Sequence, residues 1–241
     1  MISFKNKNIL ITGASGGIGN ALVKKFVSLG GNVLGAGTKT EKLDLIKKQY
    51  PNIKVKKFDI GNHSEIEEFI DSVSLELGRL DVLINNAGVA SENHVLLTPL
   101  KEAHDSLNTN FIGTFIFCRE SVKLMKMNQH GRIINISSIH VPLALAGTSI
   151  YSGSKAAIEQ FSRVLAREVF QFGITINILS LSVVKDTGME ITLKEEIKHE
   201  ILNQTISKDQ LNIYDVIHAL NFFINEKSKM VSNQILCLGG V

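Results

Sequence analysis

Short apolar runs alternate with longer amphipathic stretches along the chain. The short runs predict β-strands over residues 8–12, 32–35, 53–58, 81–85, 132–137, 175–180 and 234–238. The amphipathic stretches between them predict helices over residues 17–29, 41–49, 64–77, 100–127, 151–170 and 213–225.

Strands that alternate with long helices need right-handed crossover connections, which produce a parallel sheet covered on both faces. We therefore expect an α/β fold: a doubly wound, Rossmann-type parallel sheet of about seven strands with helices on both faces. No internal repeat, low-complexity segment or linker interrupts the pattern, so we expect a single domain over residues 1–241. Ligands bind such sheets at the carboxyl ends of the strands.

Composition excludes several classes of function. The net charge of +3 is spread over single lysines rather than a basic tract, which argues against a nucleic-acid partner. No stretch approaches the roughly 20 apolar residues that a membrane span needs, so no membrane partner is expected. Cys118 and Cys237 are too few for a disulfide framework and predict buried thiols in a cytoplasmic protein.

A glycine-rich run, Thr12-Gly-Ala-Ser-Gly-Gly-Ile-Gly19, joins the first predicted strand to the first helix. Glycine permits a tight turn and a close approach of backbone to phosphate, and a helix N-terminus favours an anion. An ordinary glycine-rich turn is the alternative interpretation. The candidate contacts of a dinucleotide pyrophosphate are Gly13, Ser15, Gly16, Gly17, Ile18 and Gly19.

Tyr151 and Lys155 are four residues apart in a predicted helix, so their side chains share one face. Tyr50 and Lys54 have the same spacing, but Pro51 disfavours a helix there. A free tyrosine has a pKa of about 10, and a nearby ammonium lowers it by favouring the phenolate. Tyr151 and Lys155 can therefore move a proton on and off a substrate oxygen.

These motifs, with Asn85-Asn-Ala-Gly88 and Ser138, resemble those of the short-chain dehydrogenase/reductase family over nearly the whole chain. Length and layout are most similar to the 3-oxoacyl-carrier-protein reductase branch. The resemblance implies hydride transfer between a nicotinamide cofactor and a ketone or secondary alcohol. It implies that Tyr151 exchanges the proton and that Lys155 binds the nicotinamide ribose. Ser138 would hold the substrate oxygen, and Asn110 would kink its helix and link Lys155 to solvent through water.

The resemblance also implies further cofactor contacts. Asp59 and Ile60 would lie at the adenine, and Val184 would place its backbone on the nicotinamide carboxamide. The ribose of the adenosine would lie beside Asn86, Ala87 and Gly88.

Cofactor choice depends on the end of the second strand, Gly35-Ala-Gly-Thr-Lys-Thr40. A carboxylate there would bind a ribose 2′-hydroxyl and repel a 2′-phosphate. Thr38 and Lys39 offer a hydroxyl and a positive charge instead, which favours NADP(H) over NAD(H). Ser15 weighs against this choice, because many NADP-using relatives have arginine there.

Several departures from the family pattern leave the substrate open. Leu181-Ser182 replaces a Pro-Gly pair, and Asp186 replaces a threonine, for which Thr187 could substitute. Val141 replaces a glycine, which predicts a bulkier apolar wall. Carrier-protein reductases tend to carry arginines where this chain has Gln129 and Phe172, so a carrier-protein partner is doubtful.

Three functions remain open at this point: reduction of a 3-oxoacyl thioester, reduction of a sugar or secondary-metabolite ketone, and noncatalytic nucleotide binding. A serine hydrolase is disfavoured because Ser138 lacks a G-x-S-x-G elbow. The histidines show no metal-ligand spacing, although His140 lies two residues after Ser138. Relatives use the helices predicted over 100–127 and 151–170 as a dimer interface, which implies a homodimer or homotetramer. Residues 187–208 could form a mobile lid over the substrate.

Overall fold

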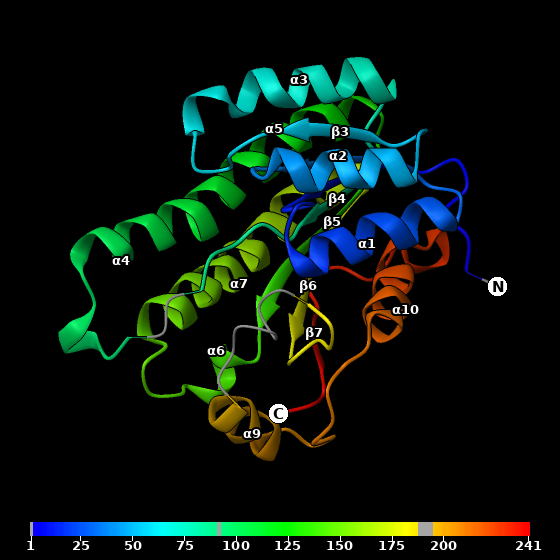
Figure 1. The fold of residues 1–241 in the computed structure, drawn as a ribbon. Helices are drawn as coiled ribbons and strands as arrows, with labels where there is room; N and C mark the ends of the chain where they lie inside the picture. Colours follow the sequence, from blue (N-terminus) through cyan, green and yellow to red (C-terminus); the bar gives the residue numbers. More distant parts are fainter. Residues whose placement is uncertain (1, 91–92, 188–194) are drawn as a thin grey trace.

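The computed structural model describes residues 2–90, 93–187 and 195–241, and it contains one seven-stranded sheet in which every neighbouring pair is parallel (Figure 1). The strand order is β3-β2-β1-β4-β5-β6-β7. The strands are β1 (Asn8–Thr12), β2 (Asn32–Gly37), β3 (Lys54–Lys57), β4 (Val82–Asn85), β5 (Gly131–Ser138), β6 (Ile174–Leu181) and β7 (Ile235–Leu238). The predicted fold class is confirmed, with each strand within two residues of its predicted limits.

The longer helices also follow the predicted pattern. They are α1 (Gly17–Ser28), α2 (Thr40–Gln49), α3 (Ile66–Leu77), α4 (Leu100–Leu107), α5 (Thr114–Met127), α7 (Ser149–Val169), α9 (Glu195–Gln204) and α10 (Ile213–Ile224). Short helical turns are η1 (His63–Glu65), η2 (Val95–Leu97), α6 (His140–Leu143), η4 (Phe170–Phe172) and η5 (Glu226–Ser228). One prediction needs correction: the helix expected over 100–127 is divided into α4, a π-helical segment η3 (Asn108–Gly113) and α5.

The helices form two layers, one on each face of the sheet. Helices α1, α2 and α10 bury their apolar residues against one face, and α3, α5 and α7 bury theirs against the other. Strands β5 and β6 are buried along their full length, as expected for strands covered on both sides. The chain direction across the sheet reverses between β1 and β4, which opens a crevice at the carboxyl ends of these strands.

A buried chain of polar side chains ties α7 to the centre of the sheet. Asn85 on β4 donates to Asn135 Oδ1 on β5 at 2.8 Å, and Asn135 donates to Ser162 Oγ on α7 at 2.8 Å. Unpaired amides in a core cost free energy, so this arrangement favours one register of α7 over its alternatives. It therefore fixes where Tyr151 and Lys155 stand relative to the sheet.

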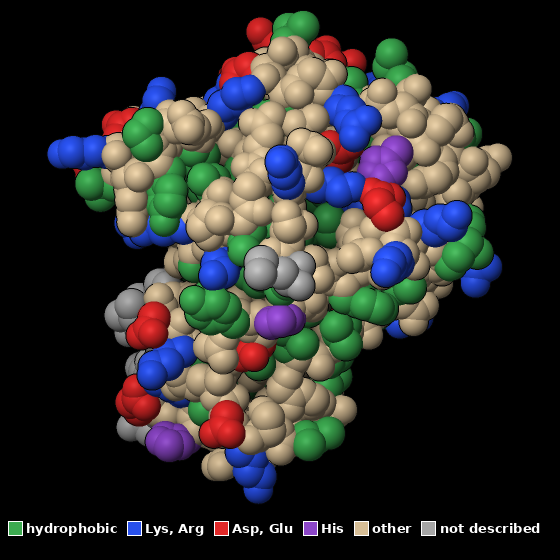
Figure 2. All heavy atoms as spheres, turned by 90° about the vertical axis from the view of Figure 1, so that its right-hand side faces the viewer, with side chains coloured by type: hydrophobic (Ala, Val, Ile, Leu, Met, Phe, Trp, Pro, Cys, Tyr) green, Lys and Arg blue, Asp and Glu red, His purple; other side chains and the backbone are tan. Residues whose placement is uncertain are grey.

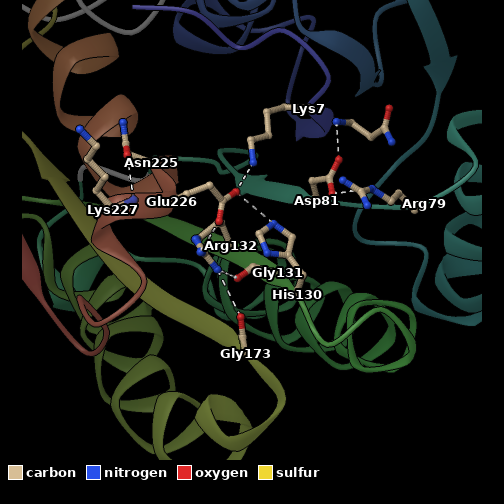
Figure 3. Close-up of polar contacts among 11 residues, drawn as sticks. Lys7, Arg79, Asp81, His130, Gly131, Arg132, Gly173, Asn225, Glu226 and Lys227 are labelled. Carbon is tan, nitrogen blue, oxygen red and sulfur yellow. Dashed lines mark hydrogen bonds and ion pairs between the residues drawn. The ribbon is translucent and has the colours of Figure 1, made fainter.

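The opposite end of the sheet, where the strands begin, is closed by an ion-pair cluster (Figure 3). Glu226 in η5 pairs with Lys7 and with the buried Arg132, whose Nη2 lies 3.2 Å from Glu226 Oε2. Asp81 accepts from Arg79 Nε at 2.8 Å and from the backbone N–H of Asn8 at 2.9 Å. These contacts hold the amino ends of β1, β4 and β5 together, far from the crevice.

Basic and acidic side chains are intermixed on the face displayed in Figure 2, without a block of one sign. Among the residues that the structure describes, no helix is both long and apolar enough to span a membrane. Both cysteines are free thiols; Cys118 is buried, whereas Cys237 is only partly buried because β7 is an edge strand.

Candidate active site

The glycine-rich turn packs directly against the loop that follows β4. Gly13 has a φ of +70°, and a Cβ at this position would lie 2.8 Å from Ala87 Cα. A Cβ at Gly19 would lie 2.1 Å from the carbonyl oxygen of Gly13. Thr12 Oγ1 accepts hydrogen bonds from the backbone N–H groups of Asn86 at 3.1 Å and Ala87 at 3.0 Å. The two loops therefore form one rigid floor at the switch point of the sheet.

The N-terminus of α1 is suited to an anion. Every residue of α1 is described, and its first turn contains no acidic side chain and no side chain that caps it. Gly17 and Ile18 open the helix, so their backbone N–H groups and the positive end of the helix dipole face the crevice, whereas the Gly16 N–H donates to the Gly13 carbonyl at 2.9 Å.

A cleft of about 850 Å³ runs along this floor, which is large enough for a dinucleotide. All of the predicted residues of the cofactor's adenosine and pyrophosphate half line it: Gly13, Ser15, Gly16, Gly17, Ile18, Gly19, Thr38, Lys39, Asp59, Ile60, Asn86, Ala87 and Gly88. The sequence interpretation missed Lys42, Phe58 and Thr109, which also line the cleft. Lys42 is one helical turn after Lys39, a spacing that could have drawn attention to it.

A second cavity, of about 100 Å³, adjoins the cleft at the ends of β5 and β6. Ser138, Tyr151, Lys155 and Val184 line it, as do Asn86 and Gly88, which also line the cleft. Its outer wall is apolar and includes Ile139, Val183 and Ile201. A nicotinamide that entered from the cleft would therefore meet a substrate between polar side chains and an apolar wall.

Tyr151 and Lys155 lie on one face of α7, and the Lys155 ammonium is 5.9 Å from the centre of the Tyr151 ring. Lys155 Nζ donates to the carbonyl oxygen of Ile136 on β5 at 2.9 Å. Burial lowers the pKa of Lys155 to about 8, because the charged form loses its hydration. Gly88 lies beside this lysine, because a Cβ at Gly88 would be 3.4 Å from Lys155 Nζ and 3.2 Å from Asn110 Oδ1.

Asn110 lies at the centre of the π-helical segment and is fully buried. Its Oδ1 accepts from the Val89 N–H at 2.8 Å, and its Nδ2 donates to the Val89 carbonyl at 2.9 Å and to Ser154 Oγ at 2.9 Å. Asn110 therefore lies where the helix is interrupted by a π-helical segment, and it connects the loop after β4 to α7. A proton route from Lys155 to solvent stays a prediction.

Ser138 is the last residue of β5, and its hydroxyl contacts two nitrogen atoms of His140. Its Oγ lies 2.9 Å from His140 Nδ1 and 3.3 Å from the backbone N–H of His140. The imidazole also packs edge-on against the Tyr151 ring, with 5.6 Å between ring centres. His140 thus contacts both side chains that would hold a substrate oxygen.

The loop after β6 places Asp186 and Thr187 differently relative to the two cavities. Asp186 is exposed, has a φ of +59° and lies outside both cavities. Thr187 is buried, lines both cavities and donates to the Val184 carbonyl at 2.7 Å. Asp186 therefore lies away from both cavities, whereas Thr187 faces them; that Thr187 substitutes for the family threonine stays a prediction.

The model of the family described as short chain dehydrogenase matches residues 7–198, which include the glycine turn and all four candidate catalytic residues. The chain belongs to the short-chain dehydrogenase family. It is an NAD(P)-dependent short-chain dehydrogenase/reductase.

Known proteins are similar to this chain over nearly its full length. The 3-oxoacyl-(acyl-carrier-protein) reductase FabG of Escherichia coli strain K12 is 28% identical over 240 residues, covering 99% of this chain and 98% of the relative. FabG of Rickettsia felis is 32% identical over 248 residues, covering 100% of this chain and 98% of the relative. A crystal structure of a putative gluconate dehydrogenase from Agrobacterium tumefaciens superposes with a TM-score of 0.91 at 26% identity, covering 99% and 96%.

The lid predicted over residues 187–208 is only partly visible, because residues 188–194 lie outside the described residues. Its described part contains α9, whose Ile201 is buried against Ile139 and Val183 beside the second cavity. Figure 1 shows α9 next to α6, near the ends of β6 and β7.

Proposed function

We propose that this protein is an NADP(H)-dependent oxidoreductase that interconverts a ketone and a secondary alcohol, with Asn110, Ser138, Tyr151 and Lys155 as its catalytic set. One observation carries the proposal: Tyr151 and Lys155 line the cavity that adjoins the dinucleotide cleft. A proton donor and a buried cation therefore stand where a ketone would meet the nicotinamide.

The bound nicotinamide supplies the hydride, and the chain's own residues handle the oxygen. Tyr151 gives its phenolic proton to the oxygen as the carbon is reduced. The positive charge of the Lys155 ammonium favours the resulting phenolate. Ser138 donates a second hydrogen bond, which strengthens as negative charge develops on the oxygen. Asn110 holds the loop after β4 against α7, so that the floor of the cleft and the catalytic helix keep their spacing.

The preference for NADP(H) is supported by the charges at the end of β2. Lys39 and Lys42 are exposed and line the cleft, whereas Glu41 points away from it on α2. Ser15 Oγ accepts from the Lys39 N–H at 3.3 Å, which holds the start of this turn beside the glycine loop. Among the described residues that line the cleft, Asp59 is the one carboxylate, and it follows β3 rather than β2. A 2′-phosphate would thus meet two cations and no repelling carboxylate.

Charge reversal of Lys39 and Lys42 tests this preference. We expect Lys39→Glu with Lys42→Glu to raise the dissociation constant of NADPH at least about tenfold, because two favourable charge contacts become repulsive. NADH binding should change less than about threefold, since NADH lacks the 2′-phosphate. Cofactor fluorescence titration measures both constants. Lys47→Glu with Lys48→Glu, which reverses two exposed charges of α2 outside the cleft, is the matched control.

The apolar wall supports a substrate with a hydrocarbon chain next to its carbonyl, and a 3-oxoacyl thioester is the class we favour. Leu143, Leu145 and Ile197 pack behind Ile139, Val183 and Ile201 and extend the wall. The names of the FabG relatives agree with this class. A sugar-derived ketone is the second candidate, because the structural neighbour is named as a putative gluconate dehydrogenase.

The proposal extends to assembly and location. We propose a cytoplasmic homodimer or homotetramer built on α4, α5 and α7, which carry the exposed apolar residues Leu100, Phe115 and Val164. The described segment α9 is proposed as part of a substrate lid. A carrier-protein partner stays doubtful: Gln129 and Phe172 are uncharged, although Lys126 lies over the Phe172 ring at 4.4 Å.

A substrate panel tests the proposed activity. Purified protein is given NADPH or NADH with acetoacetyl-coenzyme A, a medium-chain 3-oxoacyl N-acetylcysteamine thioester, 5-oxogluconate and an aryl ketone, and absorbance at the reduced-nicotinamide band is followed. We expect NADPH oxidation, fastest with the medium-chain thioester. Faster turnover of 5-oxogluconate would select the sugar-derived class, and NADPH binding without turnover on any ketone would contradict the proposed function.

A further inference from the structure

The hydrogen bonds around Ser138 determine which way its proton points. A serine hydroxyl has one proton to donate and two lone pairs that accept. The backbone N–H of His140 can only donate, so at 3.3 Å it uses one lone pair of Ser138 Oγ. The partner at 2.9 Å, His140 Nδ1, can be a donor or an acceptor, depending on the tautomer.

Only one of the two tautomers is compatible with holding a ketone. A ketone oxygen has no proton, so Ser138 must donate to it. If Nδ1 were an acceptor, it would take the Ser138 proton and leave only lone pairs facing the substrate. If Nδ1 carries the proton, the two N–H groups of His140 use both lone pairs of Ser138 Oγ. The hydroxyl proton of Ser138 can then be donated to the ketone.

The ring of His140 is held in place by its surroundings. The His140 carbonyl accepts from Ser152 Oγ at 3.1 Å, which ties α6 to the catalytic helix α7. The imidazole edge packs on the Tyr151 ring at 5.6 Å between centres, and His140 itself lines the substrate cavity. Burial lowers the pKa of His140, so the ring is neutral near pH 7 and has a single N–H to place.

We propose, on the basis of the proposed function, that His140 is a positioning residue: its Nδ1–H donates to Ser138 Oγ and keeps the Ser138 proton directed at the substrate oxygen. Donation by the imidazole also polarises the serine hydroxyl and makes it the stronger hydrogen-bond donor. The effect acts through Ser138, so it disappears when the serine hydroxyl is absent.

A double-mutant cycle of His140→Phe and Ser138→Ala tests this dependence, with a ketone that the wild-type protein reduces. His140→Phe keeps a ring against Tyr151 and removes both nitrogens. We expect it to lower kcat about tenfold, with KM and the NADPH dissociation constant within about twofold of wild type. Ser138→Ala should cost about a hundredfold or more. Adding His140→Phe to Ser138→Ala should then change kcat less than about twofold.

A second pair of variants separates hydrogen bonding from packing. His140→Asn can place an amide N–H near the position of Nδ1, whereas His140→Leu has a similar volume and no donor. We expect His140→Asn to retain kcat within about threefold of wild type and His140→Leu to match His140→Phe. This pair decides the question if His140→Phe does not bind NADPH and is therefore misfolded.

The outcomes distinguish this inference from the proposed function. Wild-type kcat in His140→Phe, or an equal loss in the presence and absence of Ser138, would overturn the role of His140 while the ketone reductase activity stands. Equal loss in His140→Asn and His140→Leu would also overturn it. If the wild-type protein oxidised NADPH with none of the ketones in the panel, both the proposed function and this inference would be overturned.

Discussion

Tyr151→Phe is expected to lower kcat for ketone reduction about a thousandfold while leaving NADPH binding within about threefold of wild type. The substitution removes one oxygen and keeps the ring that packs against His140, so its effect isolates the phenolic proton. Without that proton, the oxygen of the reduced substrate must take a proton from water, which is poorly placed in a cavity bounded by apolar residues. Stopped-flow or steady-state kinetics with NADPH in excess measures kcat, and fluorescence titration measures the dissociation constant of NADPH.

The chain offers a matched control for this experiment. Tyr50 and Lys54 repeat the spacing of Tyr151 and Lys155, but Tyr50 follows the last residue of α2 and Lys54 begins β3. Lys54 donates to the backbone carbonyl of Glu76, away from both cavities. Tyr50→Phe should therefore leave kcat unchanged. Wild-type turnover in Tyr151→Phe would reject the catalytic assignment, whatever the control shows.

Lys155→Met is expected to lower kcat about a thousandfold and to stabilise the fold at neutral pH. The activity loss, about a thousandfold, follows from the missing ammonium beside Tyr151. The gain in stability follows from burial, which lowers the pKa of Lys155 from its ordinary 10.5 to about 8. This difference corresponds to about 3 kcal/mol against folding at pH 7. Loss of the hydrogen bond to Ile136 offsets about 1 kcal/mol, leaving a net gain of about 2 kcal/mol.

The difference in stability between Lys155→Met and the wild-type protein depends on pH. The folded state disfavours the charged amine, so the wild-type protein carries the full penalty below pH 8 and loses it as the pH rises toward 10.5. The stability advantage of Lys155→Met over wild type should accordingly be largest at pH 7 and vanish near pH 10. Urea unfolding of the cofactor-free proteins at both pH values measures it, with Lys54→Met as the control. A variant less stable than wild type at pH 7 would show that the buried ammonium is stabilised by contacts stronger than its desolvation.

Local patterns in the sequence were sufficient for the architecture and for part of the candidate site, whereas Asn110, Ser138 and several cofactor contacts were expected only from the family resemblance. Apolar runs separated by long amphipathic stretches can be buried only as strands under helices, so the strand positions and the fold class follow from the chain itself. The glycine run and the Tyr-x-x-x-Lys pair are also local, because a turn and one helical repeat bring their residues together. Pro51 likewise indicates, from local sequence alone, that Tyr50 and Lys54 do not share a helix.

Contacts between distant residues were decided only by the tertiary structure. The π-helical segment around Asn110 has no signature in hydrophobic periodicity, because its side chain is satisfied by Val89 and Ser154 from other elements. The lowered pKa of Lys155 arises from its burial where α7 packs against β5, and no spacing in the sequence predicts that burial. His140 could be noted as close to Ser138, but its contact with Tyr151 depends on how α6 packs against α7. Sequence proximity places residues on the same element, whereas sheet register and helix packing determine which side chains share a cavity.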